Sequence, residues 1–332
     1  MNRSSSKIEV WQVSLKNAFK DPQKLITYLK LPKALIDPAQ KASQLFPLLA
    51  PKDYVKRIKK GDPNDPLLLQ ILPLKEELIV HPSFHKDPVG DLKSSMVPGI
   101  LQKYNERVLL ITTGACAIHC RYCFRRHFPY SSVPVGIKNW ISSLSKIKDN
   151  PEIEEIILSG GDPLVLTDKS IAHLLQYIET MPYISRIRFH TRLPIVLPNR
   201  ITSNLLHIFK QFQKTIIIVV HANHPNEIQG QCVKALQKLK KQGLLLLNQT
   251  VLLKNINDSS DIQQSLNKKL IQYGVLPYYL HQFDRVQNAA HFEVPISNGL
   301  QIMKKLQQTT SGYLIPKYVQ EIPGYPSKKL VF

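Results

Sequence analysis

Residues 107–123 read RVLLITTGACAIHCRYC, and this stretch indicates the fold class. The apolar run 108–112 has the length and composition of a strand that is buried on both faces. It leads directly into a loop that carries Cys116, Cys120 and Cys123, three of the four cysteines in the chain. Strands of this kind belong to parallel α/β sheets, which bind ligands beyond the carboxyl ends of their strands. We therefore expect a parallel α/β sheet whose active side includes the cysteine loop (116–123).

Similar strand-like runs recur along the chain, and helix-like segments separate them. The apolar runs are 108–112, 153–158, 184–189, 215–220, 243–247 and 276–280, the last interrupted by Pro277. The helix-patterned segments are 137–147, 168–181, 201–212, 226–241 and 260–273. Alternating strands and helices predict an α/β fold with right-handed crossovers. Six such units form either an incomplete barrel or a doubly wound sheet, and the periodicity alone leaves both open.

Polar and glycine residues gather where each of the six runs ends. These ends are Thr113-Gly114-Ala115-Cys116, Ser159-Gly160-Gly161-Asp162-Pro163, His190-Thr191-Arg192, His221-Ala222-Asn223-His224, Asn248-Gln249-Thr250 and His281-Gln282-Phe283-Asp284. Because the strands of a parallel sheet all end on one side, we expect these loops to form one active-site mouth.

The segment before this repeat has a different character. Proline recurs there at short intervals, with helical patterns at 21–31 and 41–46 between the prolines. We expect a helical, loop-rich region over 1–100, an α/β core over 101–300 and a C-terminal segment over 301–332. The first nine residues lack the apolar core of a signal peptide, and no apolar run reaches the roughly 20 residues of a membrane span. These features predict a cytoplasmic protein with no membrane partner.

The composition is that of a folded protein with a strong positive charge. Hydrophobic residues make up 43% of the 332 residues and charged residues 20%, which excludes a disordered chain. The 44 Lys and Arg against 24 Asp and Glu leave a net charge of +20, which favours acidic partners or a solvated basic surface. The basic residues form only small groups, without a long tail or a basic helix with exposed aromatic residues. A nucleic-acid partner is therefore not expected.

The C-x3-C-x2-C spacing of the cysteine loop favours an iron–sulfur cluster. Thiolates are soft ligands, and three of them bind three irons of a four-iron cluster and leave the fourth iron open to a non-protein ligand. Zinc with a fourth ligand from His119 or His127 is a second interpretation, and three unrelated buried thiols are a third. Cys232 lies in a helical pattern far from this loop and is expected to be a core residue.

Several motifs in the right order resemble the lysine 2,3-aminomutase family of radical S-adenosylmethionine enzymes. Besides the cysteine loop, they are Ser159-Gly160-Gly161-Asp162-Pro163-Leu164, Thr191-Arg192-Leu193-Pro194-Ile195-Val196, His224-Pro225-Asn226-Glu227, Leu247-Asn248-Gln249-Thr250-Val251-Leu252-Leu253 and Pro277-Tyr278-Tyr279-Leu280. The resemblance runs from about 97 to 328, and segments 123–130 and 326–328 are most similar to the branch that modifies elongation factor P. It implies a partial (β/α)6 barrel with a helical N-terminal region and a short C-terminal segment that carries a cofactor-binding lysine.

The resemblance implies three cofactors, which are a [4Fe-4S] cluster, S-adenosylmethionine and pyridoxal 5′-phosphate (PLP). The matching positions are Cys116, Cys120 and Cys123 for the cluster, Gly160, Gly161 and Asp162 for S-adenosylmethionine, and Tyr104, Arg107, Asn248 and Gln249 near PLP. It also implies that Lys328 forms the Schiff base with PLP, with the adjacent Lys329 as the main competitor. Tyr325, Pro326 and Ser327 stand where the family has glycines.

The implied reaction moves the amino group of L-lysine from Cα to Cβ and yields β-lysine. Arg125 matches the arginine that pairs with the substrate carboxylate, which suits its planar fork. Asp284 and Glu321 match the two acids that hold the distant ammonium, and the second is aspartate in the enzymes that act on free lysine. The branch implies that the product, in its (R) form, is attached to elongation factor P by a separate ligase, and that an electron donor reduces the cluster.

Two other functions remain open on the sequence alone. The same chemistry could make free β-lysine as a metabolite, although those enzymes carry a cysteine-bearing C-terminal extension that we do not expect here, where the chain stops at Phe332. A zinc-containing nucleic-acid-binding protein is the alternative from another class.

Overall fold

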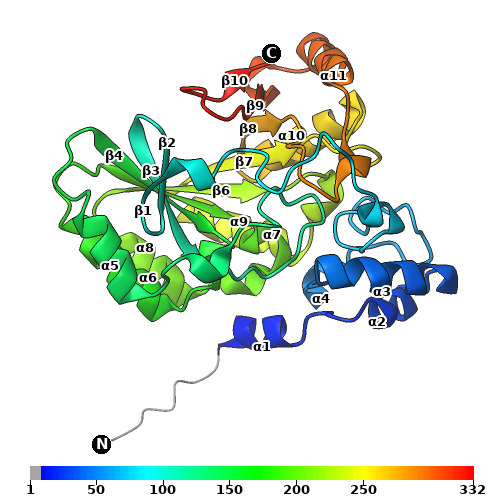
Figure 1. Cartoon of the computed structure of the whole chain (residues 1–332), viewed down its shortest axis with the longest axis horizontal. Coiled ribbons are helices and arrows are strands. Elements are labelled where there is room, and N and C mark those ends of the chain that lie inside the picture. The colour runs from blue at the N-terminus through cyan, green and yellow to red at the C-terminus, as the bar shows by residue number, and fades with distance from the viewer. Residues whose placement is uncertain (1–8) are drawn as a thin grey trace, which may run out of the picture.

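A ten-stranded sheet runs through the molecule, and its strands are neighbours in the order in which they occur in the chain. The computed structural model describes residues 9–332. Neighbouring strands from β3 to β9 pair in parallel, while β1 with β2, β2 with β3 and β9 with β10 pair antiparallel. Within the described residues β1 and β10 each pair with one neighbour only, so the sheet forms an open barrel (Figure 1). The expected partial (β/α)6 barrel is confirmed.

The six predicted strands are the six central strands of this sheet. They are β3 (Glu106–Thr113), β4 (Ile153–Gly160), β5 (Arg186–Thr191), β6 (Thr215–His221), β7 (Leu245–Val251) and β8 (Leu276–His281). Pro277 is accommodated within β8, opposite Asn248 of β7, where the register shifts by a bulge. The strand carboxyl ends therefore lie at one side of the sheet, as expected.

Helices cover the outer face of the barrel and follow the strands in turn. They are α5 (Ile137–Ser145) after β3, α6 (Asp168–Glu179) after β4, α7 (Leu193–Val196) and α8 (Ser203–Gln211) after β5, α9 (Gln231–Lys241) after β6, α10 (Ser260–Gln272) after β7 and α11 (Ile296–Thr309) after β8. Figure 1 shows α5, α6 and α8 side by side on this face.

The local sequence explains why these helices begin where they do and which face they bury. In α6 the buried residues Ile171, Leu174, Leu175 and Ile178 follow the helical repeat and form one apolar stripe. Thr167 caps this helix by accepting a hydrogen bond from the Ser170 backbone N–H at 3.2 Å, an interaction worth about 1 kcal/mol. Thr202 and Ser259 cap α8 and α10 in the same way.

Four strands were not predicted, and they extend the sheet at both ends. They are β1 (Ser95–Val97), β2 (Ile100–Tyr104), β9 (Lys317–Gln320) and β10 (Lys329–Leu330). These strands are short and their burial does not alternate, so they give no clear periodic signal in the sequence. They matter for function, because 104, 321 and 328 lie in or next to these strands and line the cavity described below.

The N-terminal region is helical, as expected, and packs under the barrel (Figure 1). Its helices are α1 (Val10–Lys16), α2 (Pro22–Tyr28), α3 (Ile36–Leu45) and α4 (Lys52–Val55), so that α3 begins earlier than predicted. Buried Leu25, Tyr54 and Leu68 join the apolar core of the barrel. The expected boundaries at 100 and 300 fall at the start of β2 and within α11.

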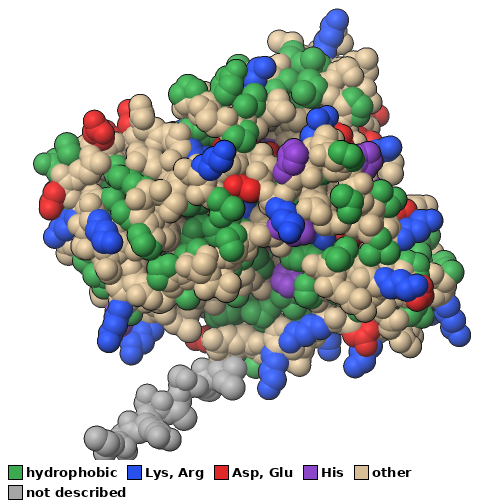
Figure 2. Space-filling view, in the orientation of Figure 1, with side chains coloured by type: hydrophobic (Ala, Val, Ile, Leu, Met, Phe, Trp, Pro, Cys, Tyr) green, Lys and Arg blue, Asp and Glu red, His purple; other side chains and the backbone are tan. Residues whose placement is uncertain are grey.

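Two further expectations concern the surface and the N-terminus. None of the helices in residues 9–332 combines the length and apolarity that crossing a lipid bilayer requires. On the face shown in Figure 2, lysine and arginine side chains are scattered and do not gather in one patch. The prediction that the chain has no signal peptide concerns residues 1–9, of which 1–8 lie outside the described residues.

Candidate active site

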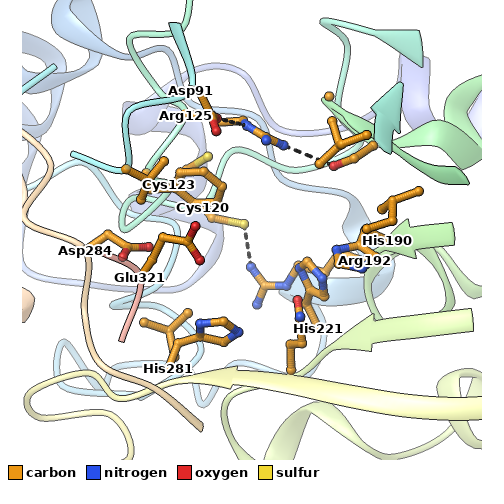
Figure 3. Close-up of a pocket in the computed structure, with 18 of the residues that line it drawn as sticks. Asp91, Cys120, Cys123, Arg125, His190, Arg192, His221, His281, Asp284 and Glu321 are labelled. Atoms are coloured by element: carbon orange, nitrogen blue, oxygen red, sulfur yellow. Dashed lines mark hydrogen bonds and ion pairs between the residues drawn. The ribbon is translucent and has the colours of Figure 1, made fainter. Parts of the chain in front are cut away.

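A cavity of about 620 Å³ lies at the carboxyl ends of the parallel strands. The cysteine loop, the ends of β4 to β8 and the C-terminal segment all contribute to its wall, as the close-up in Figure 3 shows. The volume falls in the range of small-molecule and cofactor sites. The shared active-site mouth predicted from the strand ends is therefore present.

The three thiols of the cysteine loop all line this cavity. Burial raises the pKa of Cys116 well above its ordinary value and raises the pKa of Cys123 to about 11. Cys120 Sγ accepts a hydrogen bond from Arg192 Nη1 at 2.7 Å. Three soft donors on one loop that line one cavity fit an iron–sulfur cluster. Cys232 is buried within α9, as predicted.

The histidines proposed as zinc ligands are engaged elsewhere. His119 Nδ1 lies 2.8 Å from the carbonyl oxygen of Pro47, and its ring stacks on Phe46. His127 Nε2 lies 3.2 Å from the carbonyl oxygen of Gln287. Across residues 9–332, no three His, Cys, Asp or Glu side chains converge as ligands of one metal ion.

A buried carboxylate from the N-terminal region holds the cysteine loop. Arg121 donates to Glu77 from Nε at 2.8 Å and from Nη2 at 2.6 Å, and Arg126 Nη2 donates to Glu77 at 2.7 Å. Glu77 and Arg121 are fully buried, and both arginines stack over the Phe46 ring. Because Glu77 lies far from the loop in sequence, no local pattern indicated this role.

The glycine motif after β4 is packed directly against the cysteine loop. Gly160 has a φ of +116°, and a Cβ on Gly161 would lie 2.1 Å from the carbonyl oxygen of Ala115, so neither position tolerates a side chain. The Asp162 carboxylate accepts hydrogen bonds from the backbone N–H of Arg192 and the Thr191 hydroxyl, both at 2.7 Å. Burial raises the pKa of Asp162 to about 6. This aspartate therefore fixes the loops around the glycines.

Opposite charges alternate along the far wall of the cavity. Arg125 Nε donates to Asp91 at 2.6 Å, and Lys103 Nζ lies 2.7 Å from Asp91 and 3.5 Å from Glu321. Glu321 also pairs with Lys328. Although burial opposes ionisation, Arg125 and Lys103 lower the pKa of Asp91 to about 2. The chain of charges joins the predicted residues Arg125, Glu321 and Lys328 through Asp91 and Lys103, which the sequence did not indicate.

The two lysines that compete for the PLP role have different surroundings. Lys328 lines the cavity, whereas Lys329 is exposed in β10 and pairs through its backbone with Gln320. Asp284 also lines the cavity, and burial raises its pKa to about 7, with Lys328 opposing and Glu321 reinforcing this shift.

The remaining predicted residues divide into two groups. Tyr104, Arg107 and Gln249 line the cavity, with the Arg107 guanidinium 4.7 Å from the centre of the Tyr104 ring. Tyr104 donates its hydroxyl to Glu321 at 2.7 Å. Asn248 is 1% exposed, and its amide bonds to the backbone of Ala222 at 2.9 and 3.1 Å. Asn248 thus joins β6 to β7 and does not line the cavity.

Three histidines form part of the cavity wall and were not predicted as site residues. They are His190, His221 and His281, at the ends of β5, β6 and β8 (Figure 3). Burial lowers the pKa of all three, to about 4 for His221, so that they are neutral. Their Nε2 atoms have no hydrogen-bond partner within residues 9–332. Their position at the ends of predicted strands is the sequence signal that could have identified them as cavity residues.

Comparison with known proteins agrees with this geometry. A family model described as a 4Fe-4S single cluster domain matches residues 106–189. The chain is 44% identical over 320 residues to L-lysine 2,3-aminomutase of Haemophilus influenzae, covering 96% of this chain and 95% of the relative. It is 43% identical to the enzyme of that name from Escherichia coli, covering 96% and 94%, and 32% identical to that from Clostridium subterminale, covering 95% and 76%.

A solved structure supports the fold. The crystal structure of Streptococcus suis SuiB bound to S-adenosylmethionine superposes with a TM-score of 0.50 at 15% sequence identity, covering 69% of this chain and 54% of that chain. With the extensive identity to its curated relatives, the chain belongs to the L-lysine 2,3-aminomutase family of radical S-adenosylmethionine isomerases, whose cofactors are a [4Fe-4S] cluster, S-adenosylmethionine and PLP.

Proposed function

We propose that this protein converts L-lysine to β-lysine, by moving the amino group from Cα to Cβ and a hydrogen from Cβ to Cα. One observation carries the proposal. A single cavity brings together three thiols, a lysine for PLP, an arginine and two carboxylates, which are the groups that this reaction and its two-ended substrate require. No atom is gained or lost overall, so the reaction is an isomerisation.

Cys116, Cys120 and Cys123 would hold the cluster at one end of the cavity. The cluster and S-adenosylmethionine together supply a radical that abstracts hydrogen from an unactivated carbon. Gly160 and Gly161 provide backbone that a ligand can approach closely, since they carry no side chain. The Asp162 carboxylate is already bonded to neighbouring loops, so we assign it the positioning of this backbone around S-adenosylmethionine.

Lys328 would bind PLP, because it lines the cavity and Lys329 does not. PLP supplies a conjugated ring that carries the amino nitrogen during its migration. Tyr104, Arg107 and Gln249 surround the same space, whereas Asn248 supports it from behind. When PLP occupies the Lys328 nitrogen, Glu321 loses its nearest cation and becomes available to an ammonium group.

The substrate would lie between two charged ends. Arg125 is preorganised by Asp91 at 2.6 Å and by Ser159 Oγ at 3.1 Å, which holds its fork ready for the α-carboxylate. Asp284 and Glu321 would receive the distant ammonium. A substrate with one carboxylate and two amino groups, such as lysine, matches one cation and two carboxylates in the same cavity.

We also propose the wider setting of this activity. The similarity of segments 123–130 and 326–328 to the branch that modifies elongation factor P supports an (R)-β-lysine product that a separate ligase attaches to that factor, in the cytoplasm and with an electron donor for the cluster. A product released as free β-lysine is the alternative.

We also propose a role for each of the three regions of the chain. We assign 1–100 to support of the cysteine loop, 101–300 to the cluster and S-adenosylmethionine, and 301–332 to PLP.

The test is an anaerobic incubation of the reconstituted protein with L-lysine, S-adenosylmethionine, PLP and dithionite, followed by chiral amino-acid analysis. We expect β-lysine, and none when S-adenosylmethionine is omitted. Adding elongation factor P and its ligase should place the product on the factor. Absence of β-lysine from protein that contains about four irons per chain would reject the proposed reaction.

A further inference from the structure

Arg192 links the cysteine loop to a buried polar network. It follows β5 and is 5% exposed, and its Nη1 donates to Cys120 Sγ at 2.7 Å (Figure 3). Its Nε is also buried and has no hydrogen-bond partner among residues 9–332. The guanidinium therefore contacts one of the three thiols that would hold the cluster, through a direct hydrogen bond.

Two fully buried side chains hold this guanidinium in place. Arg192 Nη2 donates to Glu227 Oε2 and to Gln70 Oε1, both at 2.7 Å. Glu227 Oε1 in turn accepts from Gln70 Nε2 at 3.3 Å and from the backbone N–H of Asn223 at 2.8 Å. The backbone carbonyl of Gln70 accepts a hydrogen bond from the backbone N–H of Arg121, within the cysteine loop, at 2.9 Å. Gln70 thus bonds both to the loop and to the arginine that contacts it.

We propose that Arg192 is a positioning residue that sets the reduction potential of the cluster, and that Gln70 and Glu227 fix its distance to Cys120. One-electron reduction of the cluster, with dithionite as the donor, adds one negative charge beside this arginine. A hydrogen-bonded cation at a ligating sulfur favours the more negative, reduced state, and so raises the potential. The Glu227 carboxylate offsets part of this effect because it pairs with the same cation.

The test is a redox titration of the reconstituted holoprotein, followed by electron paramagnetic resonance of the reduced cluster. Arg192→Gln should lower the ratio of reduced to oxidised cluster at a fixed potential by tenfold or more, which is about 59 mV for a one-electron couple. Glu227→Gln should raise this ratio, since it removes the compensating charge and keeps the shape. Arg192→Lys should recover part of the loss. Shifts of opposite sign are not expected from a merely structural role.

Arg200→Gln is the matched control. Arg200 is also fully buried and pairs with Asp168 at 2.8 Å, but it does not line the cavity. Its substitution should leave the potential unchanged. The proposal is overturned if both Arg192 variants titrate like the unsubstituted protein, if Arg192→Gln and Glu227→Gln shift the same way, or if both Arg192 variants fail to retain iron. Unsubstituted protein that binds no iron and sulfide would instead reject the cluster itself, on which this inference rests.

Discussion

Asp284 is the proposed partner of the substrate ammonium, and we expect it to lower the free energy of unfolding of the cofactor-free protein. Burial raises the pKa of this carboxyl from its ordinary value of 3.8 to about 7. The folded protein therefore holds a proton that the unfolded chain releases, and stability falls as the pH rises from 3.8 until it levels off above 7. At about 1.4 kcal/mol per pH unit, the penalty reaches about 2 kcal/mol at pH 5.5 and about 4 kcal/mol at pH 8.5.

The assay compares Asp284→Asn with the unsubstituted protein by urea denaturation of the cofactor-free form at these two pH values. Asparagine is neutral and nearly isosteric with aspartic acid, so the variant should be more stable at both pH values. The difference in free energy of unfolding between the two proteins should be about 2 kcal/mol larger at pH 8.5 than at pH 5.5. Asp149→Asn, at an exposed position, is the control and should show no such gap. A difference that does not change with pH would show that Asp284 does not carry this proton, and would refute the reasoning.

The same titration should appear in catalysis. Below a pH of about 7 the protonated Asp284 cannot pair with an ammonium, so the KM for lysine should rise as the pH falls. In Asp284→Asn the KM should be high at every pH, while cleavage of S-adenosylmethionine is retained.

Three further predictions concern other parts of the site. Cys120→Ala should lose cleavage of S-adenosylmethionine altogether, and retained cleavage by reconstituted protein would remove this thiol from the ligand set. Lys328→Ala should abolish the visible absorbance of lysine-bound PLP while Lys329→Ala keeps it, and the reverse result would place the cofactor one residue later. Glu77→Gln should lower the free energy of unfolding of the cofactor-free protein by about 3 kcal/mol, because it breaks a buried ion pair with Arg121. A loss below about 1 kcal/mol in urea denaturation would contradict this reading of the contact.

Local patterns were sufficient for the six central strands and for the mouth of the site. Continuous apolar runs such as 215–220 mark strands buried on both faces, and parallel strands must end on one side, so the polar residues that follow them meet. The same reasoning identified the position of His221 but not its part in the cavity wall. It missed β9 and β10, which are too short to show a period.

The sequence alone determined the α/β class, the cysteine spacing that suits a cluster, and the resemblance that nominates the remaining site residues. The polar and charged side chains that face one another could be identified only from the tertiary structure. Tyr104 bonds to Glu321 across 217 positions, and Arg192 bonds to Cys120 across 72. Hydrophobic periodicity encodes which face of an element is buried, whereas a charge pair forms only when separate elements meet in a particular register. The first pair forms where β2 meets the segment after β9, and the second where the loops after β3 and β5 meet.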